Sequence, residues 1–378
     1  MPRIKLLYVI TKLELGGAQK QLLSLIRNID RKNYQVYLFT AQDGMLLTEA
    51  QAINELTIKR SRFLEREINP LKDLLALFEL FRFIKKNQIR IVHTHSSKAG
   101  ILGRLAAGFA GTGIIVHTVH GWPFHDYQPV LWRSVFVWLE KMAGKFTDKL
   151  IVVSQADLQK GLKYISGQQA MYTLIHYGVD FSGPEIPASQ IRKEFGLSAD
   201  DLLVGNISCF KPQKAPQDFL RLAAAVIKEF PKAKFVLIGD GVLRDDLERS
   251  ISSLNLQGSV ILTGWRRDIS GILSAIDVFV LNSLWEGMPI SVLEAMSYTK
   301  PVVATDTGGI KEVVLEGQSG FLVEPANVEK MSEKLLVLLR DGDLRKKMGF
   351  KARAVLGTDF RLEKMVEANQ QLYVSLLN

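Results

Sequence analysis

The chain contains 378 residues, of which 47% are hydrophobic, a composition that excludes an intrinsically disordered protein and allows two domains with separate cores. Its single cysteine, Cys209, excludes an intramolecular disulfide and fits a reducing compartment. No apolar run approaches the roughly 18 residues of a membrane span, and residues 6–10 are too short for a signal-peptide core, so the sequence predicts a cytoplasmic protein.

The net charge of +9 is distributed unevenly along the chain. Residues 1–180 contain 24 lysines and arginines against 14 aspartates and glutamates, an excess of +10, whereas the remaining residues sum to −1. This asymmetry indicates a surface in the first half for an anionic partner, which could be a phospholipid surface, a lipid diphosphate or nucleic acid. A solvated basic face without a partner is the competing interpretation.

The first half alternates apolar runs, which predict strands, with amphipathic stretches, which predict helices. We expect strands at residues 5–10, 34–40, 90–95, 114–120, 149–154 and 171–177. The helical candidates between them are residues 17–28, 70–87, 99–110 and 130–146. Strands of nearly continuous Val, Ile and Leu that alternate with helices predict a parallel sheet covered on both faces.

Paired glycines, Gly16 and Gly17, stand at the first expected strand-to-helix turn. Glycine lets the backbone approach a ligand closely, and a helix start favours a phosphate, so this turn is a candidate phosphate contact. A plain turn is the competing interpretation. Because the chain has no G-x-G-x-x-G or Walker pattern, dinucleotide and P-loop chemistry are poorly supported.

Four of the six histidines cluster at the ends of two expected strands, as His93, His95, His117 and His120. His93 and His95 share one face of their strand, whereas His117 and His120 do not. Because no cysteine or H-E-x-x-H pattern lies nearby, we expect no metal site. His120, which precedes Gly121, is the candidate for a hydrogen bond to a sugar or acceptor hydroxyl. His93 and His117 are expected to be satisfied within the sheet.

Residues 122–146 are rich in aromatic side chains with basic residues between them, among them Trp132, Trp138, Arg133 and Lys141. Tryptophan and basic residues on one amphipathic helix suit a membrane interface. A core helix with several aromatic residues is the competing interpretation. The aromatic-basic motifs of nucleic-acid-binding modules are missing, so we expect no nucleic-acid partner.

The second half repeats the alternation, with strands expected at residues 202–209, 234–238, 260–264, 277–281, 301–305 and 320–323. The polar stretch 179–200 predicts a linker. The expected fold class is therefore α/β, with two doubly wound, Rossmann-like parallel-sheet domains, residues 1–180 and 181–359, that face a cleft. Residues 360–378 are expected to form an amphipathic helix that crosses back to the first domain. Ligands of such sheets bind outside the carboxyl ends of the strands.

Two lysines, Lys211 and Lys214, follow the first expected strand of the second domain. The ammonium group of lysine is a compact charge that suits a diphosphate. Solvated lysines in a surface loop are the competing interpretation.

Two glutamates, Glu286 and Glu294, lie eight positions apart around the start of an expected helix, which Pro289 favours. Glu286 would lie in the strand-to-helix turn, and Glu294 about two helical turns further along. At the positive end of the helix, where an anion binds, lie the N–H groups of Gly287, Met288 and Ile290. Two carboxylates around an anion site suit a ligand with a central phosphate and hydroxyls at both ends, such as a nucleotide-sugar.

Together these segments closely resemble a retaining nucleotide-sugar glycosyltransferase of family 4, which has the two-domain GT-B fold. The resemblance spans essentially the whole chain, and its most specific part is the Glu-x7-Glu motif from Glu286 to Glu294. The supporting segments are Gly16-Gly17 with Gln19, His93-Thr94-His95, His120-Gly121, the Lys214 segment, Gly239-Asp240-Gly241 and Thr307-Gly308-Gly309-Ile310 with Glu312. The family usually has an arginine shortly before its lysine, where this chain reads Ile207-Ser208-Cys209-Phe210, and Lys211 is the candidate substitute.

The resemblance implies a role for each of these residues. Glu294 would hold the ribose hydroxyls of the donor, and Glu286 the hydroxyls or the reacting region of the transferred sugar. The diphosphate would be bound by Lys214, by Lys211 and by the amides of residues 287–290, with Gly16 and Gly17 closing over it. No metal or other cofactor is implied, because lysine and helix amides stabilise the leaving diphosphate. The implied reaction is front-face displacement with retention.

The implied product is a cell-surface polysaccharide or a glycolipid, made on a lipid-linked or saccharide acceptor. Peripheral contact with the anionic inner face of the membrane is a further hypothesis. The alternatives are a nucleotide-sugar epimerase or phosphorylase of the same fold, or a non-catalytic, membrane-associated binding protein. Phosphorylases of the glycogen type need a Schiff-base cofactor in a much longer chain, and the intact glutamates, Lys214 and glycine turns count against a non-catalytic protein.

Overall fold

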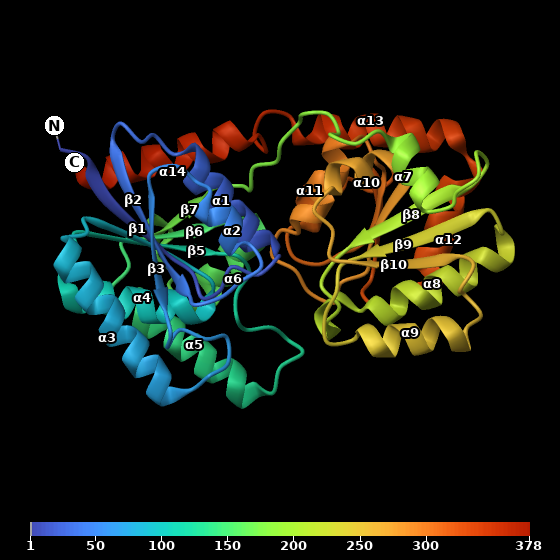
Figure 1. The fold of residues 1–378 in the computed structure, drawn as a ribbon. Helices are drawn as coiled ribbons and strands as arrows, with labels where there is room; N and C mark the ends of the chain where they lie inside the picture. The colour runs from blue at the N-terminus through green and yellow to red at the C-terminus, as the bar shows by residue number, and fades with distance from the viewer. Residues whose placement is uncertain (1) are drawn as a thin grey trace. The chain divides into compact units, whose positions relative to one another are not determined.

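The protein folds into two compact units, shown in Figure 1, and the structure, a computed structural model, describes residues 2–378. Unit 1 comprises the chain up to Gly178 together with Leu362–Asn378, and unit 2 comprises Val179–Arg361. Each unit is a parallel sheet with helices on both faces, which confirms the predicted α/β, doubly wound fold class. Among residues 2–378, no helix combines the length and apolar character that crossing a membrane requires.

Unit 1 is built on a parallel sheet in the order β3-β2-β1-β4-β5-β6-β7. Its strands are β1 (Ile4–Val9), β2 (Tyr34–Ala41), β3 (Leu56–Ser61), β4 (Ile91–His95), β5 (Ile114–Val119), β6 (Lys149–Val152) and β7 (Tyr172–Leu174). Its helices are α1 (Gly17–Asn28), α2 (Leu47–Gln51), α3 (Pro70–Asn87), α4 (Ser97–Ala110), α5 (Val130–Gly144), α6 (Gln155–Tyr164) and α14 (Leu362–Leu377), with a 3-10 turn at Gln169–Met171.

The apolar runs of these strands are continuous because both faces of the sheet are covered. Leu6 and Tyr8 of β1 pack into a core shared with α1 and α14, whereas Leu7 and Val9 pack into a second core beneath α3 and α4. Alternate residues of one strand therefore serve different cores.

Unit 2 has a parallel sheet in the order β10-β9-β8-β11-β12-β13. Its strands are β8 (Leu202–Ile207), β9 (Ala233–Ile238), β10 (Val260–Gly264), β11 (Val278–Leu281), β12 (Val302–Thr305) and β13 (Gly320–Val323). Its helices are α7 (Ala188–Glu194), α8 (Pro216–Glu229), α9 (Arg244–Ser253), α10 (Ile269–Ala275), α11 (Ile290–Ser297), α12 (Val328–Arg340) and α13 (Gly342–Leu356), with 3-10 turns at Pro212–Lys214 and Ile310–Glu312.

Four elements differ from the sequence expectations. β3, α2 and α6 were not among the expected elements, and the expected linker 179–200 contains α7. β3 is an edge strand whose residues are mostly half-buried or exposed, so it has no continuous apolar run. α7 buries Ile191 alone among its residues, which is too little for a helical period to show in the sequence.

A buried ion pair joins α4 to α5. Arg104 Nη2 donates to Glu140 Oε2 over 2.7 Å, and the two side chains are 0% and 1% exposed. Arg104 Nε also donates to the carbonyl of Gly100 at 2.8 Å. Since Glu140 and Ala143 are the buried residues of α5, this pair is its main polar attachment to unit 1.

We expect Glu140→Ala to lower the free energy of unfolding of unit 1 by about 3–5 kcal/mol, because it leaves the buried Arg104 charge uncompensated. Urea denaturation of the purified variant measures this loss. The double variant Arg104→Leu/Glu140→Leu is the control and should recover most of the lost stability, since replacing both charges by apolar groups removes the desolvation cost. An unchanged urea midpoint for Glu140→Ala would contradict the interpretation.

Candidate functional site

Glu286 lies in the turn between β11 and α11, at the carboxyl edge of the unit 2 sheet. Lys214 Nζ donates to Glu286 Oε1, and the hydroxyl of Ser283 donates to the same oxygen at 2.6 Å. The side chain of Glu286 is 7% exposed, and that of Lys214 is 16% exposed. Lys214 and Glu286 are thus in direct contact in the structure, whereas the sequence predicted only that they lie on two neighbouring turns.

Hydrogen bonds hold the Lys214 turn against the Glu286 turn. Gln213 Nε2 donates to the carbonyl of Trp285 at 2.8 Å, and the N–H of Leu284 donates to the carbonyl of Gln213 at 2.8 Å. Asn282 Nδ2 donates to the carbonyl of Ala215. These bonds fix the position of the ammonium group relative to the carboxylate from both sides.

The helix α11 presents a narrow polar face. Ser291, Val292, Leu293, Ala295, Met296 and Ser297 are buried, whereas Ile290 and Glu294 are partly exposed. Because these two positions are four residues apart, they lie on one face of the helix. The side chain of Glu294 therefore lies on the partly exposed face of α11, together with Ile290 at the start of the helix.

The turn after β12 packs against the start of α11. Gly308 has φ +57°, and a Cβ there would lie 2.2 Å from the carbonyl oxygen of Glu286, so only glycine fits. The N–H of Gly309 donates to the carbonyl of Gly287 at 2.6 Å, and Thr305 Oγ1 donates to the carbonyl of Ser283 at 2.6 Å. These contacts occupy the carbonyls of Gly287 and Ser283 and hold the Glu286 turn against the turn after β12.

Lys211 lies at the start of the same 3-10 turn as Lys214. Its N–H donates to the carbonyl of Cys209 at 2.9 Å, and its carbonyl accepts from the N–H of Lys214 at 2.9 Å. The half-buried Cys209 is adjacent to Phe210, which is wholly buried in the unit 2 core. The segment that departs from the family pattern is therefore a packed strand end.

In unit 1, Gly16 and Gly17 form the start of α1, as expected. The N–H of Gly16 donates to the carbonyl of Glu14 at 2.9 Å, and Gln19 Nε2 donates to the carbonyl of Lys12 at 3.2 Å. A Cβ on Gly16 would lie 2.6 Å from Gln19 Oε1. The turn is thus folded tightly around the Gln19 side chain.

His120 follows β5 at the carboxyl edge of the unit 1 sheet and belongs to a chain of polar rings. Its Nδ1 is hydrogen-bonded to the hydroxyl of Tyr177 at 2.6 Å, and its Nε2 to His95 Nδ1 at 2.9 Å. Burial lowers the pKa of His120 to about 3. The ring is therefore neutral near pH 7, and it is suited to hydrogen bonding rather than to carrying a positive charge.

His93 and His117 are satisfied inside the unit, as predicted. His93 Nδ1 is bonded to the hydroxyl of Tyr373 at 2.6 Å, and its Nε2 to Thr118 Oγ1 at 2.7 Å. His117 Nδ1 is bonded to Thr94 Oγ1 at 2.9 Å. His93 and His95 share a face, with ring centroids 4.3 Å apart.

Within residues 2–378, no group of three or more His, Cys, Asp or Glu side chains is arranged to hold a metal ion.

Sequence reasoning missed several residues that complete these clusters. Ser283 and Gln213 position the Glu286–Lys214 pair, while Tyr177 and Tyr373 complete the histidine cluster. Ser283 and Gln213 lie close in sequence to Glu286 and Lys214, and this closeness was the one signal that could have identified them. Tyr373 lies 280 residues from His93, and no sequence pattern connects them.

Two family models match the chain in succession. Residues 15–182 match the model described as Glycosyltransferase Family 4, and residues 188–355 match the model described as Glycosyl transferases group 1.

Characterised relatives match along most of their length. An Escherichia coli protein named UDP-Gal:alpha-D-GlcNAc-diphosphoundecaprenol alpha-1,3-galactosyltransferase is 32% identical, over 99% of this chain and 98% of its own. The N-acetyl-alpha-D-glucosaminyl L-malate synthase of Bacillus anthracis is 27% identical, over 82% of this chain and 80% of its own.

Solved structures share the fold. Anabaena HepE in complex with UDP-glucose superposes with a TM-score of 0.86 at 22% identity, over 99% of this chain and all of that chain. WaaG, a glycosyltransferase involved in lipopolysaccharide biosynthesis, superposes with a TM-score of 0.79 at 14% identity, over 97% of this chain and 99% of that chain. The expected GT-B fold is thereby confirmed.

Proposed function

Because this chain belongs to glycosyltransferase family 4 and is a glycosyltransferase of polysaccharide or glycolipid biosynthesis, we propose that it transfers a sugar from a UDP-sugar to an acceptor on a lipid diphosphate, with retention. The support for the donor and acceptor is the 32% identity to a UDP-galactose-dependent enzyme whose acceptor is a diphosphoundecaprenol-linked sugar. A lipid-linked acceptor would bring the reaction to a membrane surface.

The observation that carries the proposal is the contact between Lys214 and Glu286 beside the start of α11. A leaving diphosphate gains negative charge in the transition state, and fixed donors aimed at that charge lower the barrier. We assign this role to Lys214, supported by Lys211 and by the N–H groups of Gly287, Met288 and Ile290. Their place at a helix start favours the anion.

The two carboxylates have separate assignments. Glu286, held by Ser283 and Lys214, would orient a hydroxyl of the transferred sugar and keep the ammonium group in place. Glu294, on the accessible face of α11, would accept hydrogen bonds from the ribose hydroxyls. Neither is assigned as a covalent nucleophile, so the leaving phosphate itself would help to deprotonate the acceptor on the front face.

In unit 1 we assign the neutral ring of His120 to hydroxyl recognition. Since its Nδ1 and Nε2 are bonded to Tyr177 and His95, a substrate hydroxyl would exchange for one of these partners. Gly16 and Gly17, at the start of α1, are assigned to the donor's diphosphate. The epimerase and the non-catalytic binding protein are not favoured, because the relatives are named as transferases and synthases.

The test is to incubate the enzyme with UDP-galactose and a short-chain GlcNAc-diphospholipid, and to determine the anomeric configuration of the product by NMR. We expect a disaccharide whose new linkage keeps the donor's configuration. An inverted product would overturn the retaining mechanism. Donor alone is the control, because conversion of UDP-galactose to another UDP-sugar without acceptor would identify an epimerase.

A further inference from the structure

Two helices of unit 1 leave several large apolar side chains in solvent. Of the residues of α5, all of which the structure describes, only Glu140 and Ala143 are buried. Its exposed large apolar residues include Leu131 (75% exposed) and Trp132 (55% exposed), together with Val130, Val135 and Trp138. By contrast, Trp122 and Phe124, in the segment just before α5, are buried in a core. The aromatic segment 122–146 is therefore part core and part exposed surface.

Helix α3 has the same character. It buries Ala76, Leu80 and Ile84 on one side and exposes a second set on the other, namely Leu71, Leu74, Leu75 and Phe78. Ile68, just before the helix, is 70% exposed. Contiguous apolar surface of this kind on a soluble unit marks a contact surface.

On both helices the exposed face changes from apolar to basic along its length. In α3, Leu71, Leu74 and Phe78 recur at helical spacing and are followed on the same face by Arg82 and Lys85. The guanidinium group of Arg82 lies 4.3 Å from the centre of the Phe78 ring. The exposed Lys86 adds a further charge. Along the helix axis, Arg82 lies about 6 Å beyond Phe78 and about 16 Å beyond Leu71, at about 1.5 Å per residue.

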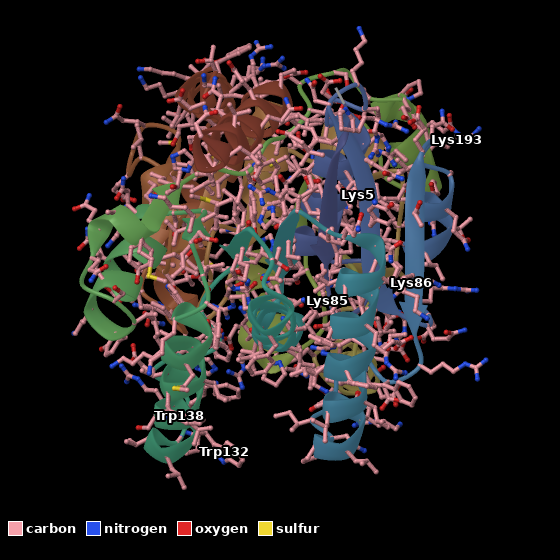
Figure 2. All side chains as sticks on the ribbon, turned by 90° about the vertical axis from the view of Figure 1, so that its left-hand side faces the viewer. Lys5, Lys85, Lys86, Trp132, Trp138 and Lys193 are labelled. Atoms are coloured by element: carbon pink, nitrogen blue, oxygen red, sulfur yellow. The ribbon has the colours of Figure 1, made fainter. Side chains whose placement is uncertain are left out.

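In α5 the order is the same. Leu131, Val135 and Trp138 form one stripe, which continues with Lys141 and Lys145. Figure 2 shows α3 and α5 descending on either side of α4, with Trp132 and Trp138 on the lower part of α5 and Lys85 and Lys86 higher on α3. Both helices therefore direct their apolar first turns to the same side of unit 1, with basic residues further along each helix.

The apolar tips lie at the functional edge of unit 1. The strands of the sheet are parallel, α3 follows β3, and α5 follows β5. Both helices therefore begin at the carboxyl edge, where β4 ends at His95 and β5 leads to His120. An acceptor held at this edge by a lipid anchor would find the apolar tips beside it.

We propose that the first turns of α3 and α5 insert into the headgroup region of an anionic phospholipid bilayer, with the basic residues further along both helices contacting lipid phosphates. An interfacial helix buries its apolar face by about 5–10 Å, so the basic residues, about 5–6 Å along the axis beyond the last apolar residue, would lie near the phosphate level. The excess of +10 in residues 1–180 attracts such a surface. A second copy of this chain would instead bring two like-charged faces together.

The proposal rests on the lipid-linked acceptor of the proposed function, but its test does not depend on transfer. The full chain is sedimented with vesicles of phosphatidylethanolamine and phosphatidylglycerol, and with vesicles of phosphatidylcholine alone. We expect binding to the anionic vesicles that weakens as salt is raised. Leu71→Ser/Leu74→Ser and Leu131→Ser/Trp132→Ser should each lower the partition constant by about 10-fold to 100-fold.

The matched control is Val242→Ser/Phe350→Ser, which removes two exposed apolar residues of unit 2 and should bind as the wild type does. All the substituted side chains are exposed, so folding is preserved, and circular dichroism verifies it. Equal binding by the wild type and both helix variants would overturn the proposal. So would failure to bind anionic vesicles, or a dimer in sedimentation velocity that these substitutions dissociate without any vesicle binding.

Transfer to a water-soluble acceptor separates the two proposals. The helix variants should retain wild-type kcat on a short-chain acceptor while losing activity on a vesicle-bound one. A wild type that binds vesicles but transfers no sugar would count against the proposed function and leave the membrane surface standing. A helix variant with full activity on the vesicle-bound acceptor would overturn the coupling of this surface to acceptor delivery.

Discussion

Replacing Lys214 by alanine is expected to lower kcat by about two to three orders of magnitude, the usual effect of removing one preorganised donor to developing negative charge. The ammonium group is held by Glu286 and by the turn that Gln213 braces, so it needs no reorganisation when the diphosphate departs. Initial rates of UDP release at saturating donor and acceptor measure the loss.

Two comparisons make this prediction specific. Lys232→Ala removes an exposed lysine of unit 2, paired with Asp200, and should leave kcat unchanged. Glu286→Gln keeps a hydrogen-bonding group of the same size but removes its charge, and it tests whether the carboxylate is required to place Lys214. Full turnover by Lys214→Ala would overturn the assignment of the diphosphate site.

The buried strands were predictable because one physical rule dominates them. A strand covered on both faces is favoured when it is apolar throughout, and β11, whose residues Val-Phe-Val-Leu are all buried, shows the rule at its strongest. β3 obeys another rule, since an edge strand such as Thr57-Ile58-Lys59-Arg60 needs polar positions. Its sequence therefore resembles a loop.

The candidate site was predictable only in its local parts. Glycine turns and the spacing of Glu286 and Glu294 are local signals, and the structure places them at the expected turns. The contact between Lys214 and Glu286 joins residues 72 positions apart, and nothing in either segment encodes their partner. The sequence likewise did not predict whether Trp132 and Trp138 are exposed, because helical spacing defines a face of a helix but does not show whether a core covers that face.

The histidine cluster of unit 1 should make the unit sensitive to acid. Burial lowers the pKa of His93 to about 3, with the charge of His120 as the second cause. Burial lowers the pKa of His120 likewise to about 3. The pKa values of His95 and His117 also lie well below the usual range, first through burial and then through neighbouring histidines and, for His117, Arg104.

The direction of the effect follows from proton binding. An unfolded histidine has a pKa of about 6.5, so between that value and the folded pKa the unfolded chain binds more protons than the folded one. The stabilising contribution of the neutral rings is complete above about pH 6.5 and is lost as the pH falls toward the folded pKa. A ring that stays neutral in the folded unit contributes a slope of at most about 1.4 kcal/mol per pH unit. Over the interval between the unfolded and folded pKa values this is a sizeable part of a domain stability of about 5–15 kcal/mol.

We therefore expect unit 1 to lose stability progressively as the pH falls from about 6.5 toward about 3. Hydrogen exchange, corrected for its intrinsic pH dependence, should show β4 and β5 losing protection over this range, with β8 of unit 2 as the internal control.

The variant His93→Gln separates this linkage from a general effect of acid on the protein. It removes hydrogen bonds to Tyr373 and Thr118 and so lowers stability at every pH, yet it should flatten the pH slope by about 1.4 kcal/mol per unit, because one titrating ring is gone. Protection of β4 that is independent of pH would mean that the pKa values of these rings are the same in the folded and unfolded chain, which would contradict the prediction.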